Sequence, residues 1–214
     1  METYTLEEAT RTARLVEKML TDIDSAYGRR GLSPKAYHNV THTRNVIFDA
    51  DAMAAAENLS YHDRYILRCA AVGHDSKHGL GPVHNERASA AKLFLEMNKA
   101  GFMLADCQRA SDLVLATIVH RSGEKIWQEV TDDPLSMILA DADLANLGKR
   151  PLRYWAGQLS LYRETYALRP FDRHAIAEFS LDFITKHEFN TQTAQVLFPY
   201  KDQNILFLKN ILAA

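Results

Sequence analysis

The sequence predicts an all-α protein, folded as a compact helical bundle. Apolar residues recur every three or four positions through most of the 214 residues, which is the spacing of one face of an α-helix. No segment shows the sustained alternation of apolar and polar residues that is typical of a half-buried strand. The nine glycines and six prolines fall between the periodic segments and form no linker, so we expect a single domain over residues 1–214.

The first helix, predicted over residues 5–27, shows the periodicity most clearly. Thr5 precedes it as an N-cap and is followed three residues later by Glu8, which is the pattern of a capping box. Gly28 comes directly after the last apolar position and is a candidate C-cap. We expect the helix to pack on the core through one apolar stripe, which consists of Leu6, Ala9, Ala13, Val16, Leu20, Ile23 and Tyr27.

The same reasoning places eight further helices along the chain. The segments beyond residue 150 make up a C-terminal helical extension over 150–214. The predicted helices span residues 39–58, 61–75, 85–101, 106–121, 133–147, 151–168, 172–187 and 200–212.

The composition excludes several classes of function. The net charge of −2 gives no strong signal for nucleic-acid binding, although a small anionic ligand needs only a local basic pocket. No window approaches 18 uninterrupted apolar residues, so we expect no membrane span. Cys69 and Cys107 are too few for a disulfide framework, and we interpret both as core residues of a cytoplasmic protein. Oligomeric state stays open, a homo-oligomer included.

Six of the nine histidines fall between His38 and His84. Imidazoles and carboxylates together suit transition-metal ions, so this region is a candidate metal site. In the stretch YHNVTH, His38 and His42 are four residues apart, so both would lie on one face if this stretch is helical. The alternative interpretation is a pair of surface histidines.

His74 and Asp75 follow a buried helical face. Ile66, Leu67 and Ala70 point inward, and His74 continues that face one turn later. A buried carboxylate such as that of Asp75 is costly unless it is paired or bound to a cation. The alternative is a helix-terminal histidine that bonds only to the backbone.

The next segment forms a turn with several polar side chains. His78, His84 and Glu86 lie in or near it, where they can contact a substrate or water, or simply be solvated. Lys77 and Arg87 are weaker candidates for contacts with phosphate. His120 lies on the apolar face of its predicted helix and is either a core histidine or a substrate contact.

Two acids interrupt the apolar segment SMILADADLANLG. Leu135, Leu139 and Asp143 share one helix face at steps of four. At least one acid therefore binds a cation or pairs with a base. Asp141 is the better candidate for a structural role, bonded to the backbone or to an arginine.

The order His…His-Asp…Asp resembles the signature of HD-domain proteins. The first ligand of that family sits in a context similar to HTRNV, which corresponds to His42. The pair corresponds to His74 and Asp75, and the second acid of the Asp-Ala-Asp pattern to Asp143. The resemblance implies that these four residues bind metal within a helical bundle of the HD-domain type.

More extended motifs sharpen the resemblance. YHNVTH, HDSKH, VLATIVH and LADADLAN are similar to stretches of class I cyclic-nucleotide phosphodiesterases, which implies that His38 is a general acid and His78 lies near a second metal. YHNVTH, GHD, NERASA, DADLANLG and LYRETYALRPFDR resemble the bacterial group of predicted metal-dependent HD phosphohydrolases over about residues 31–210. Ala177 and Ser180 stand where the phosphodiesterases hold the purine with glutamine and phenylalanine, so that mode of purine recognition is not expected.

The resemblance implies metal-dependent hydrolysis of a phosphate ester, with a nucleotide or a cyclic-nucleotide-like phosphate as the small substrate. One or two divalent ions (Mn, Mg, Fe, Co, Ni or Zn) would activate water to hydroxide. Asp75 would bridge a second ion, and Glu86 would orient the water. The alternatives are a diiron O₂-dependent oxygenase, for which His78, His84 and His120 would supply extra ligands, and a non-catalytic metal- or nucleotide-binding module.

Overall fold

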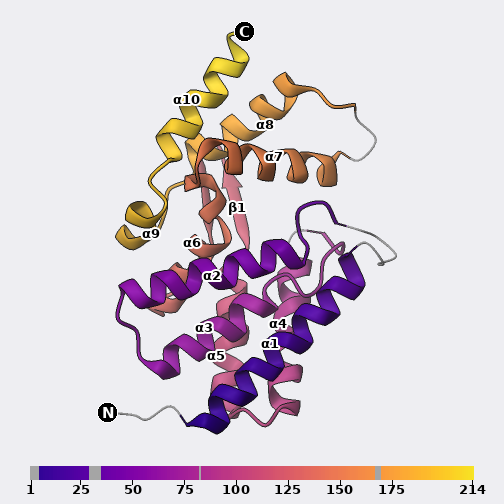
Figure 1. Ribbon diagram of the computed structural model, residues 1–214, viewed down its shortest axis with the longest axis vertical. Helices are drawn as coiled ribbons and strands as arrows, with labels where there is room; N and C mark the ends of the chain where they lie inside the picture. The colour runs from indigo at the N-terminus through magenta and orange to yellow at the C-terminus, as the bar shows by residue number, and fades with distance from the viewer. Residues whose placement is uncertain (1–4, 29–34, 82, 167–169) are drawn as a thin grey trace.

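The computed structural model describes residues 5–28, 35–81, 83–166 and 170–214, and within them the chain is mainly helical, as predicted (Figure 1). The elements are α1 (Leu6–Tyr27), α2 (Val40–Ala56), α3 (Tyr61–Gly73), α4 (His84–Lys99), α5 (Leu104–Leu115), β1 (Val119–Ser122), β2 (Lys125–Gln128), α6 (Pro134–Asp143), the 3₁₀-helix η1 (Ala145–Gly148), α7 (Pro151–Thr165), α8 (Arg173–Lys186), α9 (Gln192–Leu197) and α10 (Lys201–Leu212).

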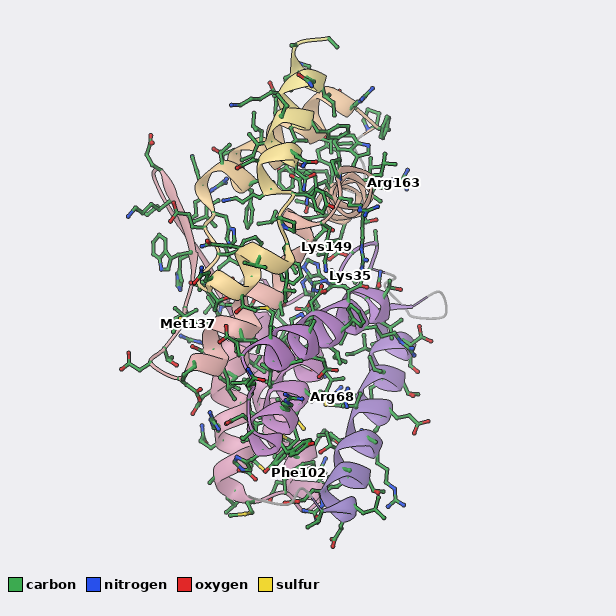
Figure 2. All side chains as sticks on the ribbon, turned by 60° about the vertical axis from the view of Figure 1, so that its left-hand side comes forward. Lys35, Arg68, Phe102, Met137, Lys149 and Arg163 are labelled. Atoms are coloured by element: carbon green, nitrogen blue, oxygen red, sulfur yellow. The ribbon has the colours of Figure 1, made fainter. Side chains whose placement is uncertain are left out.

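The helices form two groups along the long axis of the molecule. Helices α1 to α5 make the lower group in Figure 1, and α7 to α10 make the upper group. Helix α6 lies between them and contacts α2, α3, α5 and α9. In Figure 2, Phe102 lies near the lower end, whereas Lys35 and Lys149 lie near the middle. One hydrophobic core runs through both groups, from Met19 and Leu93 to Tyr154 and Leu208.

Helix α1 carries the predicted capping box. Glu8 N donates to Thr5 Oγ1, and Thr5 N donates to a Glu8 carboxylate oxygen. Gly28 is the C-cap, as predicted, although its backbone is extended rather than left-handed. The buried stripe lies one residue from the predicted one: it consists of Thr12, Leu15, Met19 and Ile23. Both stripes have helical spacing, and the long side chains of Leu15 and Met19 fill the interface, so Val16 and Leu20 lie at its edge.

The predicted helix over 106–121 is wrong in its second half. Helix α5 ends at Leu115, and β1 and β2 form an antiparallel hairpin in which Ser122 pairs with Lys125. A run of β-branched residues, Thr117 to Val119, leads into the hairpin. Gly123 has a φ of 53° and occupies the first position of the two-residue loop, where such a conformation favours glycine.

Other helix predictions need smaller corrections. The segment 133–147 divides into α6 and η1, and the short helix α9 was not predicted. The predicted helix over 151–168 corresponds to α7, and its last two residues lie outside the described ones. Cys69 and Cys107 are buried, as predicted. Among the residues that the structure describes, none of the helices combines the length and the apolar character needed to cross a bilayer.

Candidate metal centre

Three helix ends bring His42, His74, Asp75 and Asp143 together; we call these four residues the His/Asp cluster. Asn39 caps α2, its side-chain oxygen accepting hydrogen bonds from the backbone N–H groups of Thr41 and His42, so His42 lies in the first turn. His74 and Asp75 directly follow the end of α3, and Asp143 is the last residue of α6. Gly73, the last residue of α3, lets Leu93 of α4 pack against the backbone just before His74, because a Cβ there would meet Leu93 Cδ2 at 2.8 Å.

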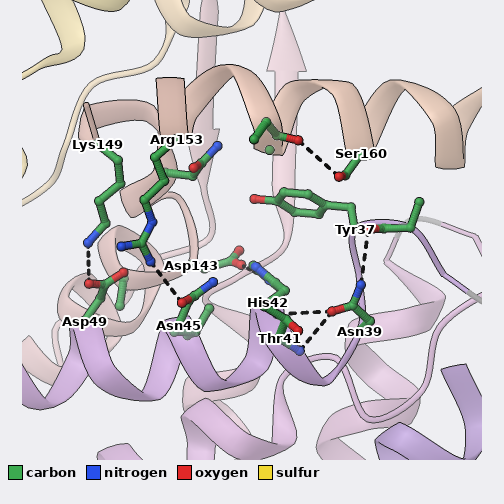
Figure 3. Close-up of a pocket in the computed structure, with 16 residues that line it drawn as sticks. Tyr37, Asn39, Thr41, His42, Asn45, Asp49, Asp143, Lys149, Arg153 and Ser160 are labelled. Atoms are coloured by element: carbon green, nitrogen blue, oxygen red, sulfur yellow. Dashed lines mark hydrogen bonds and ion pairs between the residues drawn. The ribbon is translucent and has the colours of Figure 1, made fainter. Parts of the chain in front are cut away.

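In the His/Asp cluster, His42, His74 and Asp143 offer ligand atoms close enough to share one metal ion, and Asp75 adds an oxygen beside both imidazoles. The Nε2 atoms of His42 and His74 lie 3.2 Å apart, and each is 3.1–3.5 Å from one carboxylate oxygen of Asp75 and one of Asp143. Four donors held about 2.1 Å from one ion lie about 3.0 Å apart at right angles and about 3.4 Å apart in a tetrahedron. The contact between His42 and Asp143 is drawn in Figure 3.

Two further contacts prepare the donors for a cation. His74 Nδ1 lies 2.8 Å from the Ala71 carbonyl oxygen, so Nδ1–H donates to it and Nε2 is left with a lone pair. Asp75 Oδ2 is buried and lies 3.3 Å from His42 Nε2 and 3.1 Å from His74 Nε2, but it accepts no aligned hydrogen bond. A buried carboxylate oxygen without an aligned hydrogen bond is costly, whereas a bound cation would satisfy it. The donor set therefore fits a divalent ion.

The charges of the cluster depend on one another. Burial favours the uncharged imidazole, but Asp75 and Asp143 outweigh it and raise the pKa of His42 and, further, of His74. Burial likewise opposes ionisation of the acids, yet the two histidines hold the pKa of Asp75 well below its usual range and that of Asp143 at about 2. Two carboxylates facing two imidazoles thus form a charge-paired site from which protons must leave when a cation enters.

A second group of side chains lies beside the cluster, around Glu164 of α7. Its Oε1 lies 2.7 Å from His38 Nδ1, and its Oε2 accepts the backbone N–H groups of Tyr37 and His38. The His38 ring stacks on that of His78, with centroids 4.1 Å apart and planes at 21°. Because Nδ1 of His38 faces Glu164, Nε2 is the nitrogen free to exchange a proton with a ligand.

His78 and Glu86 each carry a buried atom that has no hydrogen bond, Nδ1 in His78 and Oε2 in Glu86. Burial and the nearby His38 lower the pKa of His78 to about 4. Burial, together with the negative charges of Asp75 and Asp143, raises the pKa of Glu86. Both side chains face the same cavity as Asp75, as expected for groups near a substrate or a water molecule.

Two cavities meet at the His/Asp cluster. The apolar cavity, about 180 Å³, is lined by His38, Asp75, His78, Glu86 and Asp143 on one side. Its other walls are largely apolar and consist of Val119, Leu144, Leu147, Leu161, Phe179 and Phe183.

The polar cavity, about 240 Å³, reaches His42 and Asp143 from the other side and is shown in Figure 3. In its wall, Lys149 forms an ion pair with Asp49, and Arg153 Nη2 donates to Asn45 Oδ1 over 3.0 Å.

The four predicted substrate contacts do not reach either cavity. Lys77, His84 and Arg87 are exposed and line neither one. His120 is not on a helix, because it belongs to β1, where its ring stacks on Trp127 and contacts Glu129. The oxygenase alternative relied on His78, His84 and His120 as additional ligands. His78 lines the same cavity as Asp75 and Asp143, whereas His84 and His120 do not.

Asp141 has the structural role expected of it, although without an arginine. Its two oxygens accept four hydrogen bonds from the backbone and side chains of Asn190 and Thr191. Thr191 is the N-cap of α9. Asp141 therefore links α6 to the start of α9 in the upper group of helices. Asp143, two residues later, belongs to the His/Asp cluster.

Several residues of the site were missed by the sequence analysis. Glu164 stands in a motif that suggested the family, but no local pattern connects it to His38, which is 126 residues away. Lys149 and Arg153 follow the Asp-Ala-Asp segment and resemble ordinary surface bases. Gln128 donates to Asp143 Oδ2 over 3.3 Å and was missed because its strand was not predicted.

Comparison with known proteins supports the fold. No protein-family model matches the sequence, and no curated protein matches it. Among solved structures, the chain is similar to the crystal structure of Bacillus subtilis YpgQ in complex with ADP, with a TM-score of 0.65 and 17% sequence identity. The match covers 97% of this chain and 95% of that one, so essentially the whole chain shares a known helical architecture.

Proposed function

We propose that the protein is a metal-dependent phosphohydrolase of the HD superfamily that acts on a nucleotide-like phosphate ester. The observation that carries the proposal is the His/Asp cluster, in which each imidazole Nε2 lies 3.1–3.5 Å from a carboxylate oxygen of Asp75 and one of Asp143 where two cavities meet. His42, His74, Asp75 and Asp143 would hold the ion. When bound, a divalent ion supplies a Lewis acid that activates water and neutralises charge on phosphate oxygens.

The side chains around the cluster support hydrolysis of a phosphate ester. His38 would donate a proton from Nε2 to the leaving oxygen, since Glu164 fixes the orientation of its ring. Glu86, whose Oε2 has no hydrogen bond, would accept a hydrogen bond from water in the apolar cavity.

The two cavities fit the two ends of a nucleotide. Arg153 makes the polar cavity suitable for phosphate oxygens, because its charge is held there by the neutral Asn45, while Lys149 offsets the charge of Asp49. Phe179 and Phe183 give the apolar cavity the aromatic surface on which a flat base would stack. The ADP bound to the structural neighbour is consistent with a nucleotide ligand.

The proposal is tested with chelator-treated protein reloaded separately with Mn²⁺, Mg²⁺, Fe²⁺, Co²⁺, Ni²⁺ or Zn²⁺. Each form is assayed on a phosphodiester, a phosphomonoester and a panel of nucleotides. We expect Asp75→Ala to lose both bound metal and turnover, whereas the exposed Asp112→Ala keeps both. Retention of metal and full turnover in Asp75→Ala would refute the site.

His38→Ala separates binding from chemistry. We expect this variant to keep its metal but to lose turnover by about 100-fold, the usual contribution of a general acid. The loss should be largest for substrates with poor leaving groups, because those depend most on protonation. An equal loss with good and poor leaving groups would argue against His38 as the acid.

A further inference from the structure

A second set of possible metal ligands lies beside the His/Asp cluster and shares no residue with it. His38, His78 and Glu164 each offer one ligand atom, and the three atoms lie within 4.8 Å of one another. Glu164 Oε1 is 2.7 Å from His38 Nδ1 and 3.9 Å from His78 Nδ1. The three residues come from the segment before α2, the turn after α3 and helix α7.

Contacts with neighbouring groups hold these side chains in place. His78 Nδ1 is buried and has no hydrogen bond, and Glu164 Oε1 is the acid oxygen nearest to it. Tyr27 OH accepts the backbone N–H of His78 over 2.7 Å, which fixes the turn that carries the ring. The stacked rings of His38 and His78 present both Nδ1 atoms to the same carboxylate.

The ligand chemistry selects among cations. Two imidazoles and one carboxylate suit Zn²⁺ and similar transition ions, whereas Mg²⁺ prefers an all-oxygen shell. Ligands about 2.1 Å from one ion are about 3.0–3.4 Å apart, so the 3.9 Å between His78 Nδ1 and Glu164 Oε1 has to shorten by about half an ångström. Lys35 Nζ lies 3.6 Å from Glu164 Oε1 and competes for the carboxylate, which makes this position weaker than the His/Asp cluster with its two acids.

We propose that His38, His78 and Glu164 form a second, inhibitory site for Zn²⁺ or a similar transition ion, distinct from any ion that Asp75 bridges. The ion takes the place of the proton between His38 Nδ1 and Glu164 Oε1, and that proton leaves to solvent. The His38 ring is then a neutral, metal-bound imidazole instead of an imidazolium, and it gives up its Nε2 proton far less readily. The binding step is independent of the proposed function, whereas the inhibition rests on it.

Equilibrium dialysis against Zn²⁺, followed by metal analysis, tests the binding step. We expect two ions per chain in the wild type and one in His78→Ala. His84→Ala, which removes an exposed histidine from the start of α4, is the matched control and keeps two. Asp143→Ala, which breaks the His/Asp cluster, should keep one. Three outcomes would each overturn the proposal: the saturated wild type binds only one ion, His78→Ala binds two, or Asp143→Ala binds none.

Turnover measured against Zn²⁺ concentration tests the inhibition. In the wild type and in His84→Ala, kcat should fall by about 100-fold as the second ion binds, because the metal-bound His38 is too weak an acid to protonate the leaving oxygen. The ratio of uninhibited to inhibited kcat should approach one in His78→Ala. Two bound ions without any turnover would refute the proposed function but support the second metal site. One bound ion with normal turnover would support the proposed function but refute the second metal site.

Discussion

The carboxylate of Glu164 holds His38 by both its ring and its backbone. One oxygen lies 2.7 Å from Nδ1 of the ring, and the other accepts the backbone N–H over 3.0 Å. The same carboxylate has its pKa lowered to about 2, since these hydrogen bonds and the charge of His38 outweigh the effect of burial. Glu164 is therefore ionised at any pH at which the protein works, and it fixes the tautomer of His38.

We expect Glu164→Gln to slow the reaction without removing the metal of the His/Asp cluster. Loss of an orienting partner typically costs 10- to 100-fold in activity, and here the loss should appear in kcat rather than in KM. The measurement is steady-state kinetics across pH, with metal content determined in parallel. Glu164→Asp, which keeps the charge, should recover part of kcat. A rise in KM of about 10- to 100-fold with unchanged kcat would instead indicate that Glu164 acts in substrate binding.

Asp141 and Asp143 provide a matched pair of substitutions on one helix. Asp141→Asn replaces an acceptor of four hydrogen bonds with an amide, and we expect it to lower the free energy of unfolding by about 2–4 kcal/mol. Asp143→Asn removes a ligand from the His/Asp cluster, and we expect it to lose metal affinity with a much smaller effect on the metal-free protein.

Urea unfolding of both chelator-treated variants and metal titration of both separate these roles. The structural role of Asp141 is wrong if Asp141→Asn binds metal as poorly as Asp143→Asn and has the same free energy of unfolding as the wild type.

Local patterns predicted those parts of the fold that depend on local interactions. The capping box at Thr5 and the buried position of His74 were confirmed, and α2 and α3 begin and end within two residues of their predicted limits. The hairpin was missed because its strands are only four residues long, too short to show alternation. Glu164 could not be found, because a contact across 126 residues depends on how helices pack.

Binding of metal to the His/Asp cluster should release protons. Asp75 and Asp143 raise the pKa of His42 and His74, so the metal-free cluster holds protons on its imidazoles more tightly than free histidines do. A metal ligand must be a neutral imidazole, and we therefore expect protons to be released on metal binding and an affinity that increases with pH. Calorimetric titration at pH 6 in buffers of different ionisation enthalpy measures the number of protons released per bound ion. A titration that releases no proton would contradict this charge assignment.

His187 should make the protein sensitive to acid. Its ring is buried between Phe183 and Phe189, and neither ring nitrogen has a hydrogen bond. Burial, with a smaller contribution from Lys201, lowers its pKa from 6.5 to about 4. Between these values the unfolded chain binds a proton that the folded protein does not, so stability falls as pH decreases from 6.5 to about 4, by about 3 kcal/mol in total.

His187→Leu removes the titrating group and keeps an apolar side chain between the two phenylalanines. We expect its free energy of unfolding to fall less than that of the wild type between pH 6.5 and 4, while contributions from the other acids and histidines cancel in the comparison. His174→Leu, which changes an exposed histidine on α8, should keep the wild-type pH dependence. Parallel curves for the wild type and His187→Leu would mean that His187 takes up a proton in the folded protein as readily as in the unfolded chain. In that case the buried ring must have access to a compensating acid or to solvent.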